Sequence, residues 1–291
     1  MYKAIAANKR NTILIMAVFV AIIGVIGWVV SYFYDDINIA YYVTFIAIIY
    51  ALVQYFIADK LSVAMTGAKQ IEKRDNPRFY RIIENLAITT GMQMPKVYII
   101  DDPAPNAFAT GRDPRHAIVA ATTGLIDLMN DSELEAVMAH EMGHVKNYDI
   151  RVGMIAFGLV SAISLLTDIV MRMFIFGDRD SDDNSPVVMI IGVIAIVLAP
   201  IIAAIIQMAV SRQREYLADA TSAMTTRNPE SLVTALEKLK SSSRPMKRQS
   251  TASAHLFFAN PLKAGFLNKL FSTHPPIEDR INRLRNNANK F

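Results

Sequence analysis

Long apolar stretches interrupt the polar positions of this chain at four places. They cover residues 12–33, 38–57, 152–176 and 187–210, and each contains at least 20 residues. About 20 apolar residues are enough for an α-helix to cross the hydrocarbon core of a bilayer. The first stretch is too long for the core of a signal peptide and no cleavage-site pattern follows it, so it predicts an uncleaved anchor. The whole pattern predicts a multi-pass α-helical membrane protein.

The third stretch, 152–176, contains two charged residues, Asp168 and Arg172. They are four positions apart on one helix face and would neutralise each other. A buried core helix is an alternative for this stretch, and an ionisable pair inside a membrane can also belong to a transport pathway. Together with residues 187–210, the stretch predicts a helical hairpin that either spans the bilayer or dips into it from one side.

The charged residues beside the apolar stretches predict the orientation in the membrane. Lysines and arginines precede the first stretch and follow the second and the fourth, whereas the loops after the first and third are acidic. Because basic flanks stay on the cytoplasmic side, both termini and the large polar segments are expected in the cytoplasm. The prediction is a protein of the plasma (inner) membrane, with the lipid bilayer as a partner.

Composition narrows the chemistry that is available to the polar segments. The chain is 53% hydrophobic and 19% charged, which again favours a membrane protein with a modest globular part. It contains no cysteine, so any metal must bind to His, Asp or Glu. The net charge is +4, but the basic residues flank apolar stretches and form no patch interleaved with aromatics. No nucleic-acid partner is therefore expected.

The polar segments have the patterns of helices and short strands. Helices are predicted at residues 76–92, 227–240 and 273–284, and strands at 95–101, 105–111 and 116–122. In NDSELEAVMAHEMGH, Ser132 and Glu135 have the spacing of a capping box, which predicts the start of a further helix near Ser132.

These elements predict a cytoplasmic α+β domain that a membrane hairpin interrupts. Two N-terminal transmembrane helices are expected within residues 1–57. The first part of the domain, with the small sheet, covers 58–151, the hairpin covers 152–210, and the second part of the domain covers 211–291.

The sequence HEMGH at residues 140–144 has the spacing of a metal site on a helix. His140 and His144 are four positions apart, so both imidazoles leave one helix face and can bind the same ion. Glu141 lies about 100° around the helix from His140, where it can take a proton from a water molecule that zinc acidifies. Gly143 allows close approach of another element. Two surface histidines on an amphipathic helix are the alternative interpretation.

A catalytic zinc ion needs a third protein ligand and an open position. In one known arrangement a glycine and a third histidine follow the second histidine, but Asn147 and Ile150 occupy those positions here, and Asp149 is one residue away from an alternative aspartate position. A better candidate is SRQREYLADA (211–220), after the fourth apolar stretch. There Glu215 could bind zinc while Asp219 accepts a hydrogen bond from a ligand imidazole. Two solvated carboxylates on a helix would give the same pattern.

At this point the chain resembles a known family. HEMGH, an apolar hairpin, EYLAD and STHPP follow one another as in the HtpX-type membrane zinc metalloproteases, which are relatives of the prenyl-protein CAAX proteases. The resemblance covers almost the whole chain. It implies a gluzincin-like fold in which His140, His144 and Glu215 bind one zinc ion, Glu141 is the general base, and the site faces the cytoplasm just outside the bilayer.

The resemblance also implies a function, that of a zinc metalloendopeptidase. Such an enzyme would hydrolyse misfolded or damaged membrane proteins in quality control and stress response. Applied to PNAFATG, it implies that Asn106, Ala107 and Phe108 form an edge strand that pairs with the substrate backbone. Applied to THPP, it implies that His274 donates a hydrogen bond to the oxyanion, with a capping or packing role as the alternative.

Three other functions are consistent with parts of the sequence. A zinc-binding but inactive scaffold would be expected to lose Glu141 or a ligand first, and both are present. A channel or transporter would be expected to have polar residues in several spans. A prenyl-CAAX protease would be expected to have more than four spans. The sequence leaves open the natural substrate, the cleavage preference, self-cleavage and the oligomeric state, including a homo-oligomer.

Overall fold

The computed structural model describes residues 2–156, 158–159, 162, 212–242, 244–247, 257–258 and 275–288. The chain divides into two compact units. The first, which we call the polar unit, consists of residues 1–9, 57–154 and 210–291. The second, which we call the helical unit, consists of residues 10–56 and 155–209. Both units contain part of the first helix, because its residues 2–9 belong to the polar unit.

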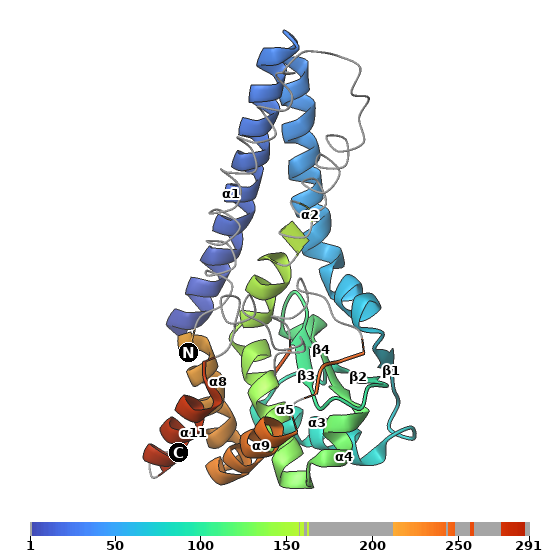
Figure 1. Ribbon diagram of the computed structural model, residues 1–291, viewed down its shortest axis with the longest axis vertical. Helices are drawn as coiled ribbons and strands as arrows, with labels where there is room; N and C mark the ends of the chain where they lie inside the picture. Colours follow the sequence, from blue (N-terminus) through green and yellow to red (C-terminus); the bar gives the residue numbers. More distant parts are fainter. Residues whose placement is uncertain are drawn as a thin grey trace. The chain divides into compact units, whose positions relative to one another are not determined.

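Two long helices, α1 (Tyr2–Phe33) and α2 (Asn38–Thr66), contain the first two apolar stretches (Figure 1). In the helical unit they pack closely where α1 carries glycine. A Cβ atom at Gly24 would lie 3.1 Å from Thr44, and one at Gly27 would lie 2.9 Å from Val43. Small residues of this kind are what close helix packing in membranes requires.

The outward surfaces of these helices are apolar. Residues 5–32 and 38–57 are long and apolar enough to cross a membrane. Large side chains remain more than half exposed on both helices, including Ile13, Trp28, Tyr32, Phe45 and Ile46. An apolar surface of this extent is expected to be covered by lipid rather than water. Of the predicted hairpin, residues 152–156 are helical. Asp168, Arg172 and the fourth stretch lie outside the described residues.

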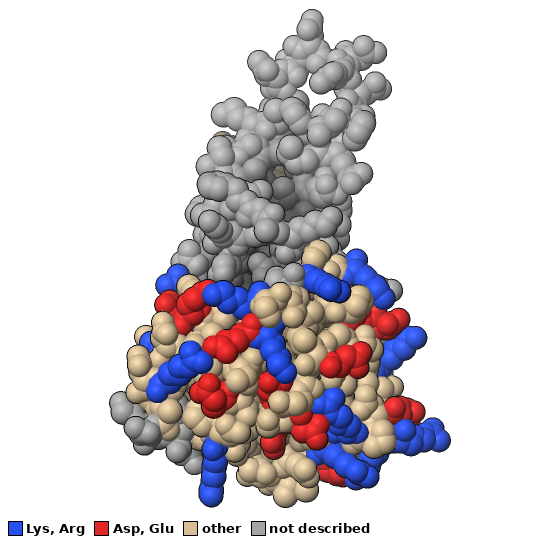
Figure 2. Space-filling model, turned by 60° about the horizontal axis from the view of Figure 1, so that its bottom comes forward, with Lys and Arg blue, Asp and Glu red and all other residues tan. Residues whose placement is uncertain are grey.

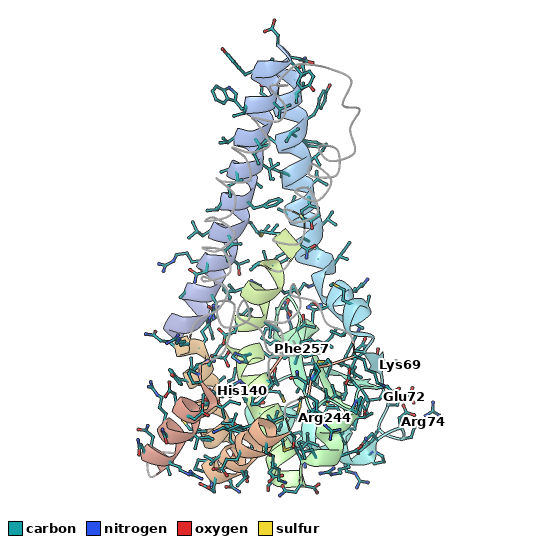
Figure 3. All side chains as sticks on the ribbon, in the orientation of Figure 1. Lys69, Glu72, Arg74, His140, Arg244 and Phe257 are labelled. Atoms are coloured by element: carbon teal, nitrogen blue, oxygen red, sulfur yellow. The ribbon has the colours of Figure 1, made fainter. Side chains whose placement is uncertain are left out.

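A four-stranded sheet forms one layer of the polar unit, in the order β1-β2-β4-β3. The strands are β1 (Lys69–Gln70), β2 (Lys96–Ile100), β3 (Ala107–Thr110) and β4 (Ile118–Thr122). β2 and β4 are parallel, and the other two pairs are antiparallel. The three strands predicted from the sequence are confirmed. The short edge strand β1, beside Glu72 and Arg74 in Figure 3, was not predicted.

Helices pack against this sheet and against one another (Figure 1). They are α3 (Pro77–Thr90), α4 (Thr123–Leu128), α5 (Asp131–Lys146), α8 (Arg212–Thr226), α9 (Pro229–Ser241) and α11 (Ile277–Asn286). α5 contacts α3, α8, α9 and two strands, and its side chains Leu134, Val137 and Met138 are fully buried. The metal-site motif therefore lies on the central helix of the unit, where packing from several sides holds it.

α5 starts at Asp131, close to Ser132 as predicted, but its capping box lies two residues before the predicted one. The N-cap is Asn130, whose Oδ1 accepts from the Glu133 backbone N–H, while the Glu133 carboxylate accepts from the Asn130 N–H. Ser132 lies inside the helix and its hydroxyl donates to Asn130 Oδ1. The predicted capping box of Ser132 and Glu135 was wrong because asparagine caps a helix as well as serine does, and Asn130 also has a glutamate three residues later.

The carboxylate of Glu133 also joins α5 to α9. It lies 2.6 Å from Lys238 Nζ and is buried. Burial would raise its pKa, but the Lys238 ammonium and the Asn130 N–H outweigh burial and lower it. A carboxyl pKa that is lowered by folding stabilises the protein above the unfolded-state value, and the stabilisation is lost as the pH falls through the folded-state value.

Glu133→Gln keeps an acceptor for the Asn130 N–H but removes the charge that faces Lys238, and it should lower the stability at pH 7 by up to about 1 kcal/mol. The measurement is the thermal unfolding midpoint of wild type and variant between pH 7 and pH 3. The difference between them should shrink as the pH falls through the lowered pKa of Glu133, because the wild-type carboxylate then becomes protonated. A difference that is the same at every pH would contradict a role for the charge.

On the face of the polar unit in Figure 2, acidic and basic side chains alternate. No single sign of charge dominates this face.

Candidate metal centre

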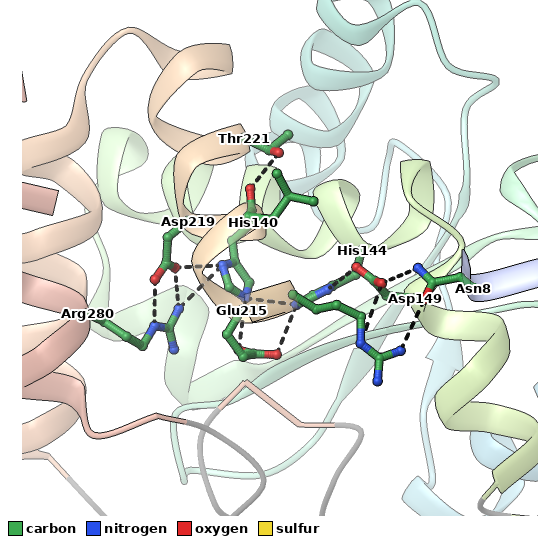
Figure 4. Close-up of polar contacts among 10 residues, drawn as sticks. Asn8, His140, His144, Asp149, Glu215, Asp219, Thr221 and Arg280 are labelled. Carbon is green, nitrogen blue, oxygen red and sulfur yellow. Dashed lines mark hydrogen bonds and ion pairs between the residues drawn. The ribbon is translucent and has the colours of Figure 1, made fainter. Parts of the chain in front are cut away.

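Two imidazole nitrogens of the polar unit face each other (Figure 4). His140 and His144 lie one turn apart on α5, and their Nε2 atoms are 3.1 Å apart. The His140 ring is fully buried, and the His144 side chain is 14% exposed. The helical spacing therefore directs two nitrogen donors to one point, as the sequence predicted.

A carboxylate from α8 completes the group. Glu215 Oε1 lies 3.5 Å from His144 Nε2, and Glu215 Oε2 lies 3.7 Å from His140 Nε2. The two helices can approach closely because residue 143 is glycine, where a Cβ atom would already lie 3.3 Å from the Thr221 Cβ. Ser222 strengthens the contact, since its hydroxyl donates to the Ala136 carbonyl.

The donor set has the chemistry and the spacing of a catalytic zinc site. His140, His144 and Glu215 each offer one ligand atom, and these atoms lie within 4.8 Å of one another. Ligand atoms about 2.0–2.1 Å from one tetrahedral zinc ion lie about 3.3 Å from each other, close to the separations found here. Two histidines and one glutamate also leave the fourth position free for water or substrate. The residues present therefore fit a zinc ion.

A buried ion pair orients the first histidine. Asp219 Oδ1 lies 2.9 Å from His140 Nδ1, the nitrogen that points away from the other ligands. Arg280, from α11, donates to both oxygens of Asp219, over 2.6 Å from Nη2 and 3.0 Å from Nε. Arg280 is 1% exposed. The chain of contacts Arg280–Asp219–His140 therefore fixes the ring so that Nε2 faces the metal position.

A second carboxylate contacts the other histidine. Asp149 Oδ2 lies 3.1 Å from His144 Nδ1, and Asp149 is 8% exposed. The sequence had suggested Asp149 only as an imperfect candidate for the third ligand. In the structure it lies on the far side of the ring from the ligand nitrogen, and Glu215 lies at the third ligand position. Each ligand imidazole is thus contacted by its own carboxylate.

The pKa values of the two histidines are shifted in opposite directions. Burial, together with the positive charges of Arg280 and His144, lowers the pKa of His140 to about 4. Burial would also lower the pKa of His144, but the carboxylates of Glu215, Asp149 and Glu141 outweigh burial and raise it to about 9. The site thus attracts one positive charge at the position between the rings. A bound metal ion would supply this charge.

Other side chains close the site. Glu141 is 3% exposed. It follows His140 on α5, and its charge contributes to the raised pKa of His144. The Phe258 ring packs edge-on against His140, with the ring centroids 4.9 Å apart, and the Arg280 guanidinium lies over the same phenyl ring. A carboxylate beside the metal position, in surroundings that exclude most water, can hold and transfer a proton.

The strand that was predicted to pair with substrate is present, but part of its outer edge already pairs with residues 257–258. Asn106, Ala107 and Phe108 are all buried. The Phe258 N–H donates to the Ala107 carbonyl over 2.8 Å, and Phe108 forms an antiparallel bridge with Phe257, which is labelled in Figure 3. Substrate pairing at this edge would have to displace the Phe258 hydrogen bond. His274 lies outside the described residues.

Two histidines and a glutamate form a buried group, and a second glutamate follows the first histidine on a helix that packs against a small sheet. This arrangement is typical of a metallopeptidase. The comparison with known families agrees, since the sequence model of Peptidase family M48 matches residues 73–288. The chain belongs to Peptidase family M48, and it is a membrane-bound metallopeptidase.

Similar proteins support this assignment over the full length. A Protease HtpX homolog of Tropheryma whipplei (strain Twist) is 55% identical over 291 residues, which is 100% of both chains. One from Streptococcus gordonii is 42% identical and covers 98% of this chain and 99% of its own. The crystal structure of S. mikatae Ste24p has the same fold over 98% of this chain and 67% of its own, with a TM-score of 0.53 and 20% identity. The resemblance to the HtpX-type proteases is confirmed.

The sequence analysis missed Arg280 and did not predict the contact of Asp149 with His144, although each residue leaves a signal in the sequence. Arg280 occupies a core position of α11, since Ile277, Ile281 and Leu284 have the spacing of one helix face with it. An arginine on an apolar face requires a buried acidic partner. Asp149 follows His144 by five residues, just after the helix ends, and an acidic residue there can reach back to a ligand imidazole.

Proposed function

We propose that this chain is a zinc-dependent endopeptidase of the plasma (inner) membrane that hydrolyses misfolded or damaged membrane proteins in quality control and stress response. The observation that carries the proposal is the group of His140, His144 and Glu215, with the charge of Glu141 close enough to raise the pKa of His144. The apolar surfaces of α1 and α2 and the relatives named as proteases support it. The basic flanks of the apolar stretches favour a site on the cytoplasmic side.

His140, His144 and Glu215 would hold the ion, and Asp219 and Asp149 would keep the two rings in place. When bound, zinc would polarise the scissile carbonyl and lower the pKa of a water molecule. Glu141 accepts a proton from the attacking water, whose oxygen forms a bond to the carbonyl carbon. Glu141 then returns this proton to the amine as the C–N bond breaks. In this proposal His274 donates a hydrogen bond to the oxyanion, and residues 106–108 align the substrate as an added strand.

The test of the function is metal removal and replacement. The full chain would be purified in detergent with a chelator, and its hydrolysis of casein would be measured before and after zinc or magnesium is added. Zinc should restore hydrolysis and magnesium should not, because imidazole nitrogens suit zinc and not magnesium. Full activity after complete removal of metal would contradict the proposal. Cleavage of a prenylated peptide but not of casein or an unfolded membrane protein would favour a CAAX-type specificity instead.

The third ligand has its own test. Glu215→Ala should lose its zinc, because two imidazoles without the carboxylate leave the ion with too few protein ligands. Elemental analysis of the purified protein measures the zinc content. Glu230→Ala is the matched control, since Glu230 is an exposed carboxylate on the neighbouring helix α9 and should leave the zinc content unchanged. Full zinc occupancy in Glu215→Ala would exclude Glu215 as a ligand.

A further inference from the structure

The first turns of α1 reach the metal centre although the rest of that helix belongs to the helical unit. Asn8 lies in the polar unit and is 4% exposed. Its side-chain Nδ2 donates to the Asn147 carbonyl over 2.9 Å and to Asp149 Oδ1 over 2.6 Å. An amide NH₂ group has two N–H bonds, so both are used on residues that directly follow α5.

Asp149 connects Asn8 to a metal ligand. One oxygen of its carboxylate accepts from Asn8, and the other lies 3.1 Å from His144 Nδ1. Arg214 of α8 closes the group, because its Nη1 donates to Asn8 Oδ1 over 3.4 Å and its Nε lies 3.9 Å from Asp149 Oδ1 (Figure 4). The arrangement parallels that around His140, where Arg280 holds Asp219. Here the carboxylate is held by an asparagine from the N-terminal helix.

The turn that precedes Asp149 contains a strained backbone conformation. Tyr148 has φ of 62°, in the left-handed region that non-glycine residues rarely adopt. Such a conformation costs about 1 kcal/mol or more and persists only when its surroundings fix it. Lys9 Nζ lies 4.7 Å from the centre of the Tyr148 ring, and Arg151 also lies over that ring. Asn8 and Lys9 thus contact three consecutive residues, 147–149.

We propose that Asn8 is a positioning residue for the metal centre, which holds the Asp149 carboxylate in the place where it orients His144. The inference rests on the proposed zinc site. Asn8 does not touch substrate or metal and acts through Asp149. Zinc affinity consequently depends on how the start of α1 packs in the polar unit. The same helix continues as a predicted membrane span.

The experiment measures the zinc dissociation constant of the full chain in detergent by competition with a chelator. Loss of a group that orients a ligand imidazole typically weakens metal binding about 10- to 100-fold. We expect Asp149→Ala to fall in this range and Asn8→Ala to weaken binding about 10-fold, at its lower end. Asp149→Asn keeps an acceptor for His144 Nδ1 and should recover part of the affinity that Asp149→Ala loses.

The double variant separates a positioning role from a general effect on the fold. If Asn8 acts through Asp149, Asn8→Ala should cause no further loss of affinity in the Asp149→Ala background. Asn11→Ala is the matched control, because Asn11 lies three residues further along the same helix, and it should bind zinc as wild type does. The thermal midpoint of each zinc-free protein reports whether it is folded.

Three results would overturn the inference. They are an unchanged dissociation constant in Asn8→Ala, equal losses in Asn8→Ala and Asn11→Ala, and full additivity in the double variant. A lowered thermal midpoint with unchanged zinc affinity would likewise assign Asn8 to the fold alone. Failure of the proposed function is a separate outcome, since wild type would then bind no zinc or would bind it without hydrolysing casein.

Discussion

Glu141→Gln should bind zinc as wild type does and should lose nearly all peptide hydrolysis. The carboxylate is not one of the three ligand residues, and glutamine has almost the same volume, so the metal centre should remain assembled. A glutamine amide cannot accept the proton of the attacking water and return it to the leaving amine. General acid–base catalysis by one side chain contributes about 10²- to 10⁴-fold, so a loss of this size is expected in kcat.

The measurement combines zinc content by elemental analysis with the rate of casein hydrolysis. Glu135→Gln is the matched control, because Glu135 lies on the same helix, is partly exposed and precedes the metal ligands. It should retain both zinc and activity. Hydrolysis by Glu141→Gln at the wild-type rate would exclude Glu141 as the general base. Loss of zinc together with activity would show that Glu141 supports the metal centre instead.

The metal centre could be predicted where spacing along one helix determines it. His140 and His144 share a helix face because 3.6 residues make one turn, and the structure places their Nε2 atoms together. The helix boundaries at Asn76 and Asn228 were equally predictable, because an asparagine followed by proline marks a helix start. These features depend on residues that are near one another in the chain.

Features that depend on distant residues were only partly predictable. Glu215 is 71 positions after His144, and its candidacy came from the second pair of carboxylates and from the family resemblance. The contacts of Asp149 with Asn8 and of Asp219 with Arg280 join residues that are 141 and 61 positions apart. No periodicity connects such residues, because the packing of separate helices brings them together. Periodicity does show that Arg280 shares a face with apolar residues, but it does not identify its partner.

The buried pair of Arg280 and Asp219 predicts the largest effect on stability. Arg280→Met keeps much of the side-chain volume but leaves the Asp219 carboxylate buried without its guanidinium partner. The pKa of Asp219 is about 2 in the intact protein, because Arg280 and His140 outweigh the effect of burial. Removing one partner of a buried ion pair costs about 3–5 kcal/mol. The thermal midpoint should fall by about 10 °C, with weaker zinc binding because His140 loses its oriented partner.

The effect can be assigned to the unpaired charge by two further variants. Arg285→Met is the matched control, because Arg285 lies on the same helix in a half-exposed ion pair with Glu237 and should change the stability by less than about 1 kcal/mol. Adding Asp219→Asn to Arg280→Met removes the unpaired carboxylate. The double variant should therefore be more stable than Arg280→Met alone, although its zinc affinity should stay low because the charged partner of His140 is gone. If the double variant is instead the least stable protein, the lost packing of Arg280 against Phe258 outweighs the charge.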